Sequence, residues 1–326
     1  MEINRKNAKM WQRIGPRATY GLALQDLIEN NGRVYALSGD LGGSSGLSRL
    51  MSESPDRYLN VGIAEQNLIG VSAGLAKEGL IPFASSFAPF ITHRCEDQIR
   101  MNMGYMHLNI KLVGLGSGVS MSILGNSHYG MTDMSVLTAT PGMAILSPCD
   151  CAELVKCVEA AAEYEGPVYI RMTGEPGMPR VYEEEFEFEI GKTNKLRSGD
   201  DVLILATGSM VHKSLDAAKK LEDNDIKCDV YDIHTVKPLD ETVFMEVSNR
   251  KLMVTAEEHS VIGGLGSSVN KYVANHGLGI KVINIGLPDA YVDSGSYEYM
   301  LEELGLTVDS LVSNIEKELN DGKKVD

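Results

Sequence analysis

The stretch that most constrains this chain is residues 60–100, which reads NVGIAEQNLIGVSAGLAKEGLIPFASSFAPFITHRCEDQIR. A short β-type run ends at Gly62, and Glu65 stands near the start of a predicted helix whose apolar residues recur at helical spacing. Gly79 stands where helices commonly stop, and the apolar run Ile81–Phe83 follows at once. The stretch therefore predicts a strand, a helix and a second strand in close succession.

Three ring side chains follow the second predicted strand at intervals of three residues, namely Phe87, Phe90 and His93. In a helical turn this spacing places the three rings on one side. A stripe of this kind is by itself typical of a protein core, and a glutamate at a helix start is typical of a cap. Taken alone, these residues favour a capping glutamate and a core stripe over a binding site.

The segment as a whole closely resembles the pyrimidine-binding segment of the transketolase family of thiamine diphosphate enzymes. This family includes 1-deoxyxylulose-5-phosphate synthase and the β subunits of 2-oxoacid dehydrogenases. V-G-I-A-E-Q-N matches the family's G-I-x-E block, and S-S-F-A-P-F matches its T-F-x-x-F block at the expected distance. Each block is weak alone, but both occur in order on a strand–helix–strand–loop frame. The resemblance covers roughly residues 14–320.

The resemblance implies roles for the carboxylate and the rings. In this family thiamine diphosphate performs the chemistry, and the protein holds its aminopyrimidine in the imino tautomer through a buried carboxylic acid. Glu65 matches that catalytic acid. Phe87, Phe90 and His93 match the residues that hold the pyrimidine, where stacking contributes roughly 0.5–1.5 kcal/mol per pair beyond burial. His93 replaces an aromatic residue of the transketolases.

A glycine-rich loop, residues 38–46, follows the predicted strand Val34–Leu37. Open α/β sheets bind ligands at the carboxyl ends of their strands, although a plain flexible loop is the alternative here. The further cofactor-binding candidates are Asp40 and Leu41 of this loop and Ile63 of V-G-I-A-E. Asp40 is not part of a metal-binding G-D-G motif, because Leu41 follows it. No metal ligand is therefore expected on this chain.

Three residues fall on family positions that bind a substrate phosphate, namely Arg17, Ser44 and Arg171. Cations and hydroxyl donors suit phosphate esters, although each residue alone is typical of a protein surface. His128, in G-N-S-H-Y-G, matches a histidine of the family's substrate loop and is the second catalytic candidate.

The substrate loop departs from the family pattern at two positions. The aspartate that reads the donor's hydroxyl is Leu124 here, and an earlier histidine is Gly116. A site built to hydrogen-bond a hydroxyl discriminates strongly by it, so losing that acceptor relaxes or redirects specificity. The pair xylulose 5-phosphate and ribose 5-phosphate is therefore in doubt, and a related ketose phosphate is an open alternative.

Strands alternate with helices along most of the chain, which predicts an α/β fold with mostly parallel sheets. Residues 1–14 are expected to be a polar arm, and residues 174–200, with the acidic run EEEFEFE, an interdomain linker. We predict a pyrimidine-binding domain at 14–180 and a smaller α/β transketolase C-terminal domain at 190–326. LILATGS, TVKPLD, EEHSVIGGLGSSV and GLPD carry the resemblance of the second domain. His259, in EEHS, is either an interface or site residue or a structural histidine.

Composition excludes several classes of function. A net charge of −15 argues against binding nucleic acid or an anionic membrane surface. No apolar stretch reaches the length of a membrane span, and MEINRKNAKMW lacks a signal-peptide core. The cysteines do not have the spacing of a metal site and are expected to be buried thiols in a reducing compartment. We therefore expect a cytoplasmic chain.

The G-D-G motif by which relatives bind the cofactor's diphosphate and Mg²⁺ does not occur in this sequence. The resemblance therefore implies the C-terminal subunit of a split transketolase, which transfers a two-carbon ketol unit between sugar phosphates. It implies a partner subunit of roughly 250–300 residues that supplies the diphosphate and Mg²⁺ site. Two copies of each chain would form a heterotetramer with two-fold symmetry.

Two other interpretations stay open. One is a β subunit of a 2-oxoacid dehydrogenase or an enzyme like deoxyxylulose-phosphate synthase. The other is a non-catalytic scaffold subunit, which the presence of Glu65, Phe87 and Phe90 disfavours.

Overall fold

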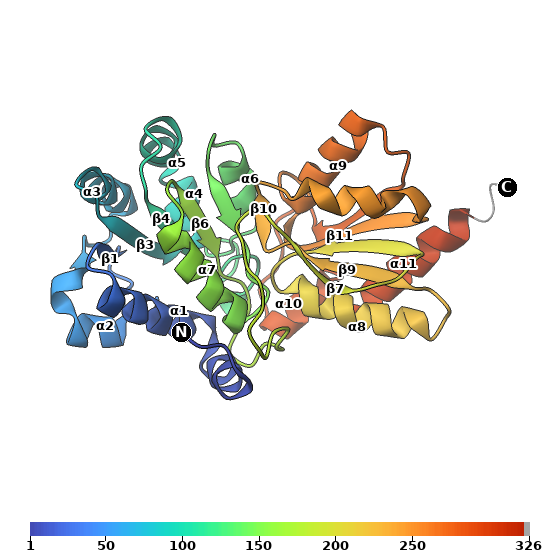
Figure 1. Ribbon diagram of the computed structural model, residues 1–326, viewed down its shortest axis with the longest axis horizontal. Helices are drawn as coiled ribbons and strands as arrows, with labels where there is room; N and C mark the ends of the chain where they lie inside the picture. The colour runs from blue at the N-terminus through green and yellow to red at the C-terminus, as the bar shows by residue number, and fades with distance from the viewer. Residues whose placement is uncertain (323–326) are drawn as a thin grey trace.

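The computed structural model describes residues 1–322 and consists of two α/β domains that lie side by side (Figure 1). The first holds a seven-stranded sheet in the order β10-β5-β6-β4-β3-β1-β2, and the second a five-stranded sheet in the order β12-β11-β8-β9-β7. The pairs β10–β5 and β7–β9 are antiparallel and the others are parallel. The predicted α/β architecture is confirmed. Residues 323–326 of the predicted second domain lie outside the described part.

The elements of the first domain alternate between strands and helices. Its strands are β1 (Val34–Ser38), β2 (Tyr58–Asn60), β3 (Ile81–Phe87), β4 (Lys111–Leu115), β5 (Ala144–Leu146) and β6 (Val168–Arg171). Its helices are α1 (Arg5–Asn30), α2 (Ser48–Glu53), α3 (Glu65–Lys77), α4 (Ala88–His93), α5 (Glu96–Ile99), α6 (Asp133–Thr138) and α7 (Cys151–Glu163), with the short turns η1 (Pro55–Arg57), η2 (Arg100–Tyr105) and η3 (Ser122–Leu124).

The second domain repeats the alternation on a smaller scale. Its strands are β7 (Asn194–Arg197), β8 (Val202–Ala206), β9 (Cys228–Asp232), β10 (Thr235–Lys237), β11 (Leu252–Ser260) and β12 (Val282–Leu287). Its helices are α8 (Met210–Glu222), α9 (Leu265–His276), α10 (Tyr297–Glu303) and α11 (Val308–Gly322), with the turn η4 (Glu241–Asn249).

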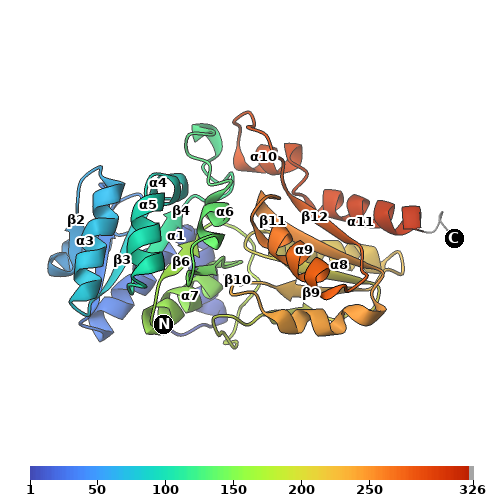
Figure 2. The same cartoon turned by 90° about the horizontal axis from the view of Figure 1, so that it is seen from above.

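The core sits on both faces of the two sheets. β4, β5, β6 and β8 are buried along their whole length, as expected for parallel strands covered on both sides. One apolar cluster contains residues of α1, α7, α8 and α11, and the other contains residues of α4, α5, α6 and α9. Figure 2 shows α3, α4 and α5 grouped together in the first domain. Each cluster crosses from one domain to the other, so the domains share their core.

The N-terminal residues form a helix, and the prediction of a polar arm is wrong. α1 begins at Arg5, where the Asn4 side chain accepts a hydrogen bond from the backbone N–H of Asn7. Trp11 is fully buried, so one face of this segment belongs to the core. α1 kinks at Gly15, whose φ of 82° suits glycine and is followed by Pro16. This kink places the start of the second half of α1 beside the carboxyl edge of the first sheet.

The second domain contributes a strand to the first sheet, which the sequence did not predict. β10 pairs with β5 across residues Thr235 and Leu146, directly after β9 has crossed the second sheet. In the predicted linker, the glutamates of the acidic run are exposed or half-buried, while Phe186 stacks on Tyr182 with ring centroids 3.7 Å apart. Within residues 1–322, no helix is long and apolar enough to cross a membrane.

Candidate active site

Glu65 lies at the first position of α3, at the carboxyl edge of the first sheet. Its side chain is only 6% exposed. Its Oε1 accepts a 3.5 Å hydrogen bond from the Ser86 hydroxyl near the end of β3. The Nη1 of Arg94 lies 3.3 Å from Oε1 and 3.2 Å from Oε2. Burial, reinforced by the negative charge of Glu65, raises the pKa of the adjacent Cys95 thiol to about 12, so this cysteine stays protonated at neutral pH.

The rings beside Glu65 come from a strand end, a short helix and a distant loop. β3 extends to Phe87, four residues beyond the predicted Phe83, so Phe87 closes a strand and is not in a helix. The rings of Phe87 and Phe90 meet edge to face with centroids 5.8 Å apart. His128 joins them, at 5.6 Å from Phe87 and 5.2 Å from Phe90. The structure therefore brings the second predicted catalytic residue to the predicted pyrimidine-binding rings.

His93 has a different environment from the other two members of the predicted stripe. Its side chain is exposed, and its Nε2 lies 3.0 Å from the Thr132 hydroxyl. It borders a cavity of about 430 Å³ between α4 and the loop 288–291 of the second domain. His93 is thus close in sequence to the ring cluster but faces the interdomain side.

The glycine-rich loop and the loop before α3 are joined by Asn60. The Asn60 side-chain oxygen accepts hydrogen bonds from the backbone N–H groups of Asp40 and Gly62, each at 3.0 Å. Its amide donates to the Asp40 carboxylate at 3.0 Å, and the Leu41 N–H donates to the Ser38 hydroxyl at 2.9 Å. Between these loops and Glu65, Ile63 is 79% exposed. Single exposed apolar residues are normal on protein surfaces, so this exposure leaves Ile63 accessible to a ligand or another chain without indicating one.

Arg17 and Ser44 line one cavity of about 580 Å³, together with Ser122 and with Ser120, whose hydroxyl already donates to the Ser117 carbonyl at 2.8 Å. The Arg17 guanidinium donates a 3.5 Å hydrogen bond to the Ser44 carbonyl, and both residues are exposed. Burial raises the pKa of Glu175 in the same cavity, while the positive charge of Arg17 opposes that shift. The structure therefore brings two of the three predicted phosphate residues together at a cavity with hydroxyl donors.

The prediction that Arg171 binds a substrate phosphate is wrong. Its side chain is 1% exposed, and its Nε binds both carboxylate oxygens of Asp133, at 2.9 and 3.1 Å. Its Nη2 donates to the backbone carbonyls of Gly130 and Glu258 at 3.4 and 2.6 Å. A phosphate could reach this guanidinium only by breaking a buried ion pair. Arg171 is therefore a structural residue that connects β6 to the second domain.

His259 lies at the same interface and is a structural histidine there. Burial lowers its pKa to about 4, so the ring is neutral near pH 7. Its Nε2 accepts a 3.3 Å hydrogen bond from the Ser135 N–H, and its Nδ1 donates to the Ser260 carbonyl at 2.7 Å. Both ring nitrogens are thus used, Nε2 across the domain interface and Nδ1 within β11.

The loop that carries His128 is held by a glutamate of the second domain. Glu258 is fully buried, and it accepts hydrogen bonds from the Val119 N–H at 2.9 Å, from the Tyr297 hydroxyl at 2.5 Å and from the Ser209 hydroxyl. Leu124, further along this loop, is 48% exposed. The second domain therefore fixes the base of the predicted substrate loop and leaves its tip open.

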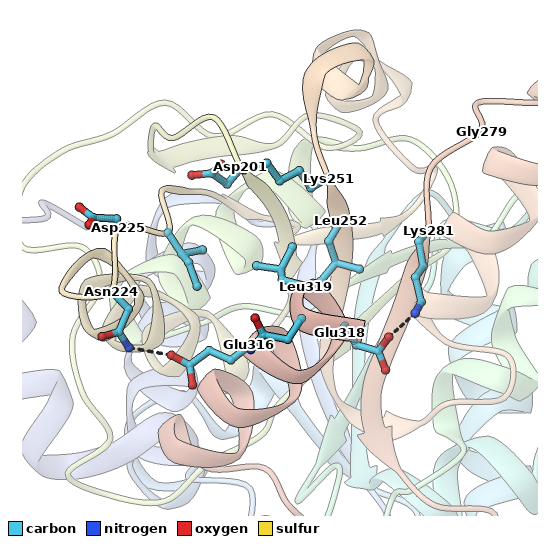
Figure 3. A pocket seen from close by; sticks show the side chains of 12 residues that line it. Asp201, Asn224, Asp225, Lys251, Leu252, Gly279, Lys281, Glu316, Glu318 and Leu319 are labelled. Carbon is cyan, nitrogen blue, oxygen red and sulfur yellow. Dashed lines mark hydrogen bonds and ion pairs between the residues drawn. The ribbon is translucent and has the colours of Figure 1, made fainter. Parts of the chain in front are cut away.

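A larger cavity, of about 910 Å³, lies in the second domain near the amino ends of β8, β11 and β12 (Figure 3). Its polar side chains already bind one another. Asn224 donates to Glu316 at 2.6 Å, Lys251 pairs with Asp201 at 2.5 Å, and Lys281 pairs with Glu318. Because its lysines and most of its acids are already paired within it, this cavity is a weaker candidate than the edge that holds Glu65.

Sequence reasoning missed two residues of the site, Arg94 and Glu258. Arg94 follows His93 directly, so its position next to the three ring residues could have identified it as a residue of the site. Glu258 reaches the His128 loop from 139 residues away in the chain. No local pattern indicates such a contact.

Family models match both domains. The model described as "Transketolase, pyrimidine binding domain" matches residues 12–175, and "Transketolase, C-terminal domain" matches residues 191–311. A transketolase C-terminal section from Methanocaldococcus jannaschii is 37% identical over 94% of this chain and 96% of that protein.

Two further relatives extend over nearly the whole chain. The 6-deoxy-6-sulfo-D-fructose transketolase subunit SqwH of Clostridium sp. (strain MSTE9) is 38% identical over 91% of this chain and 92% of that protein. A solved split-gene transketolase, in an inactive β4 tetramer, superposes with a TM-score of 0.87 at 39% identity. It covers 94% of this chain and 99% of its own.

Proposed function

Because the chain belongs to the transketolase family, we propose that it is the C-terminal subunit of a split transketolase. In this proposal it transfers a two-carbon ketol unit between sugar phosphates, and it is active only with a partner chain. The observation that carries the proposal is the cluster of Glu65, Phe87, Phe90 and His128 at one edge of the first sheet.

The residues at this edge fit the aminopyrimidine end of thiamine diphosphate. When bound, that cofactor supplies the carbanion-stabilising chemistry of ketol transfer. Glu65 would share a proton with a pyrimidine nitrogen, and its 6% exposure would keep water from competing for that hydrogen bond. Phe87 and Phe90 would hold the heterocycle, and Ile63 would contact its exposed side. His93 would reach the cofactor only from the neighbouring cavity that it lines with Thr132.

The glycine-rich loop is proposed to complete the cofactor site. Asn60 fixes the backbone at Asp40, and Leu41 is held through Ser38, so both residues are presented in one arrangement. The Mg²⁺ and diphosphate ligands are proposed to come from the partner, because the G-D-G motif does not occur in this sequence. The solved split-gene transketolase is described as an inactive β4 tetramer, which supports a need for a second type of subunit.

The cavity of Arg17 and Ser44 is the proposed site for the substrate's terminal anion. Arginine and hydroxyl donors suit a tetrahedral oxyanion, and Ser120 and Ser122 line the same space. His128 is proposed to bind the sugar's carbonyl or hydroxyl oxygens near the reacting carbon. One relative is named for a sulfofructose substrate, whose anion is not a phosphate, so the sugar is the open part of the proposal.

The test is reconstitution of ketol transfer. The chain is purified alone and together with a candidate partner that carries a G-D-G diphosphate domain, and both are assayed with thiamine diphosphate and Mg²⁺. The substrate panel contains ketose phosphates and 6-deoxy-6-sulfo-D-fructose. We expect turnover only from the pair, and a two-to-two stoichiometry by light scattering. Full activity of the chain alone, or no turnover by the pair on any ketose, would overturn the proposal.

A further inference from the structure

Arg94 occupies a particular position between the two groups proposed to hold the cofactor's pyrimidine. Its Nη1 lies 3.2 and 3.3 Å from the carboxylate oxygens of Glu65. Its guanidinium carbon lies 3.9 Å from the centroid of the Phe90 ring. One planar group therefore makes a hydrogen-bonded ion pair with the acid and stacks on the aromatic ring.

These are the contacts that a bound aminopyrimidine would make. A guanidinium and an aminopyrimidine are both flat, and both present nitrogen atoms along one edge to a carboxyl group. Both also favour the face of an aromatic ring. Because Glu65 is 6% exposed, little of its carboxyl group is open beside Arg94. The guanidinium and the pyrimidine therefore compete for the same acid and the same ring.

We propose that Arg94 is a displaceable occupant of the pyrimidine site, so that thiamine diphosphate binds only when the guanidinium swings away from Glu65 and Phe90. The inference rests on the proposed cofactor site at Glu65, and it adds a residue that controls access to that site. In the chain without its partner, Arg94 would keep the acid paired and the ring covered.

The surroundings of Arg94 suit such a movement. Its side chain is 52% exposed, so solvent can receive the guanidinium when it leaves. Its backbone is anchored separately, because the Arg94 carbonyl accepts a 3.0 Å hydrogen bond from the Gln66 side chain. The residue can therefore change rotamer without moving the end of α4. The cation of this ion pair is half exposed although its acid is buried, and a single cation–π contact is weak, so a ligand that also gains diphosphate contacts can displace the guanidinium.

A second possible role for Arg94, as a clamp on the bound cofactor, leads to a different expected affinity. If Arg94 stayed in place and clamped the bound cofactor, its removal would weaken cofactor binding. If it is displaced, its removal strengthens binding, because the competitor is gone. The sign of the change in affinity therefore separates a competitor from a clamp.

The experiment measures cofactor affinity by calorimetry on the chain assembled with its partner, at fixed Mg²⁺. Arg94→Ala should bind thiamine diphosphate roughly 5- to 30-fold more tightly than the parent, as expected from losing one ion pair with a half-exposed cation and one cation–π contact. Arg94→Lys keeps the charge but not the flat guanidinium, so it should fall between the two. Arg100→Ala is the matched control, because Arg100 is an exposed arginine that pairs with Asp97 and not with Glu65.

Glu65→Gln separates failure of the inference from failure of the proposed function. If Glu65→Gln loses affinity while Arg94→Ala binds as the parent does or more weakly, the site is real and Arg94 is not a competitor. If the parental assembly binds no thiamine diphosphate and Glu65→Gln changes nothing, the proposed function fails, and the inference fails with it. Tighter binding by Arg94→Ala with unchanged binding by Arg100→Ala supports the inference.

Discussion

Two regions of this molecule bury carboxylates, and they do so in opposite ways. In the rim site, defined by Glu65, Arg94 and Phe90, the acid is buried but its cation is half exposed and stacked on a ring. The second region is the buried interface between the two domains, called the domain seam below. There Asp133 is fully buried and its partner Arg171 is 1% exposed. A carboxylate that must exchange its cation for a ligand is paired with a cation that can move out into solvent. A group that holds two domains together has a partner that cannot leave without a large desolvation cost.

The domain seam contains a second acid pair, and among the described residues no cation is paired with it. Glu153 of α7 and Asp232 of β9 are both fully buried, and a carboxylate oxygen of each converges with the Cys149 sulfur within 4.8 Å. The other oxygens are satisfied, because the Cys149 N–H donates to Glu153 at 2.7 Å and the Tyr182 hydroxyl donates to Asp232 at 2.8 Å. Two carboxyl groups so close, away from water, oppose each other's ionisation, so the pair is expected to keep a proton above the usual carboxyl pKa.

The largest expected effect is loss of activity at the rim site without loss of stability. Glu65→Gln keeps the shape of the side chain but cannot share a proton, so ketol transfer by the assembled pair should fall by about 10²–10⁴-fold. The melting temperature should stay within the error of the parent's. Glu78→Gln, at the exposed far end of α3, is the control and should keep full activity. Activity of Glu65→Gln within a few-fold of the parent would remove Glu65 from the chemistry.

The next largest expected effect is a loss of folding stability, which comes from the domain seam and not from the rim site. Arg171→Met leaves Asp133 buried without its cation, which should lower the free energy of unfolding by about 3–5 kcal/mol. Urea denaturation of the purified chain measures this. In the double variant with Asp133→Leu, part of the stability should return, because no unpaired charge remains. If Arg171→Met unfolds as the parent does but raises KM for phosphorylated sugars only, Arg171 would be a substrate residue after all.

The third prediction concerns whether Arg17, near the rim site, binds the phosphate of the substrate. Arg17→Ala should raise KM for phosphorylated ketoses by about 10- to 100-fold, which corresponds to one charge-assisted hydrogen bond of about 1.5–3 kcal/mol. Unphosphorylated analogues should be affected much less. Arg13→Ala, on the same helix and also exposed, serves as the comparison. Equal losses on both kinds of substrate would mean that Arg17 supports the cavity without reading the anion.

The difference between the two regions also explains what the sequence could predict. The residues Glu65, Phe87 and Phe90 lie close together in one continuous stretch of sequence, so their grouping could be predicted from the sequence. His128 could be placed by resemblance to a loop motif. Arg171 could not be read in this way, because whether an arginine at a strand end faces a cavity or a buried aspartate depends on Asp133, 38 residues away. β10 was missed for the same reason, since its three residues gain their strand geometry from β5.

The N-terminal helix illustrates a third case, in which polar composition conceals a buried face. Residues 5–14 contain many charged and amide side chains, which favours an arm, yet Ala8 and Trp11 pack into the core. Two apolar residues three apart are a weak periodic signal.

The smallest expected effect is a pH dependence that comes from the acid pair of the domain seam. Burial raises the pKa of Asp232 to about 6, and burial together with Asp232 raises the pKa of Glu153 well above its usual value. The folded state therefore holds protons that the unfolded chain releases near pH 4. Because the folded state binds more protons, its stability should fall as pH rises through and beyond pH 6. The slope is at most about 1.4 kcal/mol per pH unit for each proton.

Glu153→Gln is the variant that isolates this dependence. Its amide can donate a hydrogen bond to Asp232 but cannot ionise, so unfolding free energy measured in urea should depend less on pH between 6 and 9 than in the parent. Four further titratable groups face the pair, namely Asp150, Cys149, Cys157 and Tyr182. Burial raises the pKa of each, so these groups also favour their protonated forms in the folded state. Glu163→Gln, exposed at the end of α7, should leave the parental slope unchanged.

The three converging atoms of Cys149, Glu153 and Asp232 could alternatively be held by a metal ion, and the same titration distinguishes the two cases. A larger fraction of the carboxyl groups is protonated as pH falls, so protonation of the acid pair makes the parent most stable at the acid end of the range. A metal requires deprotonated ligands, so its contribution grows as pH rises and is lost in a chelator. We expect the parent's profile to be the same with and without EDTA. A stability that increases toward pH 8 and falls with EDTA would show that the seam is closed by a cation and not by a proton.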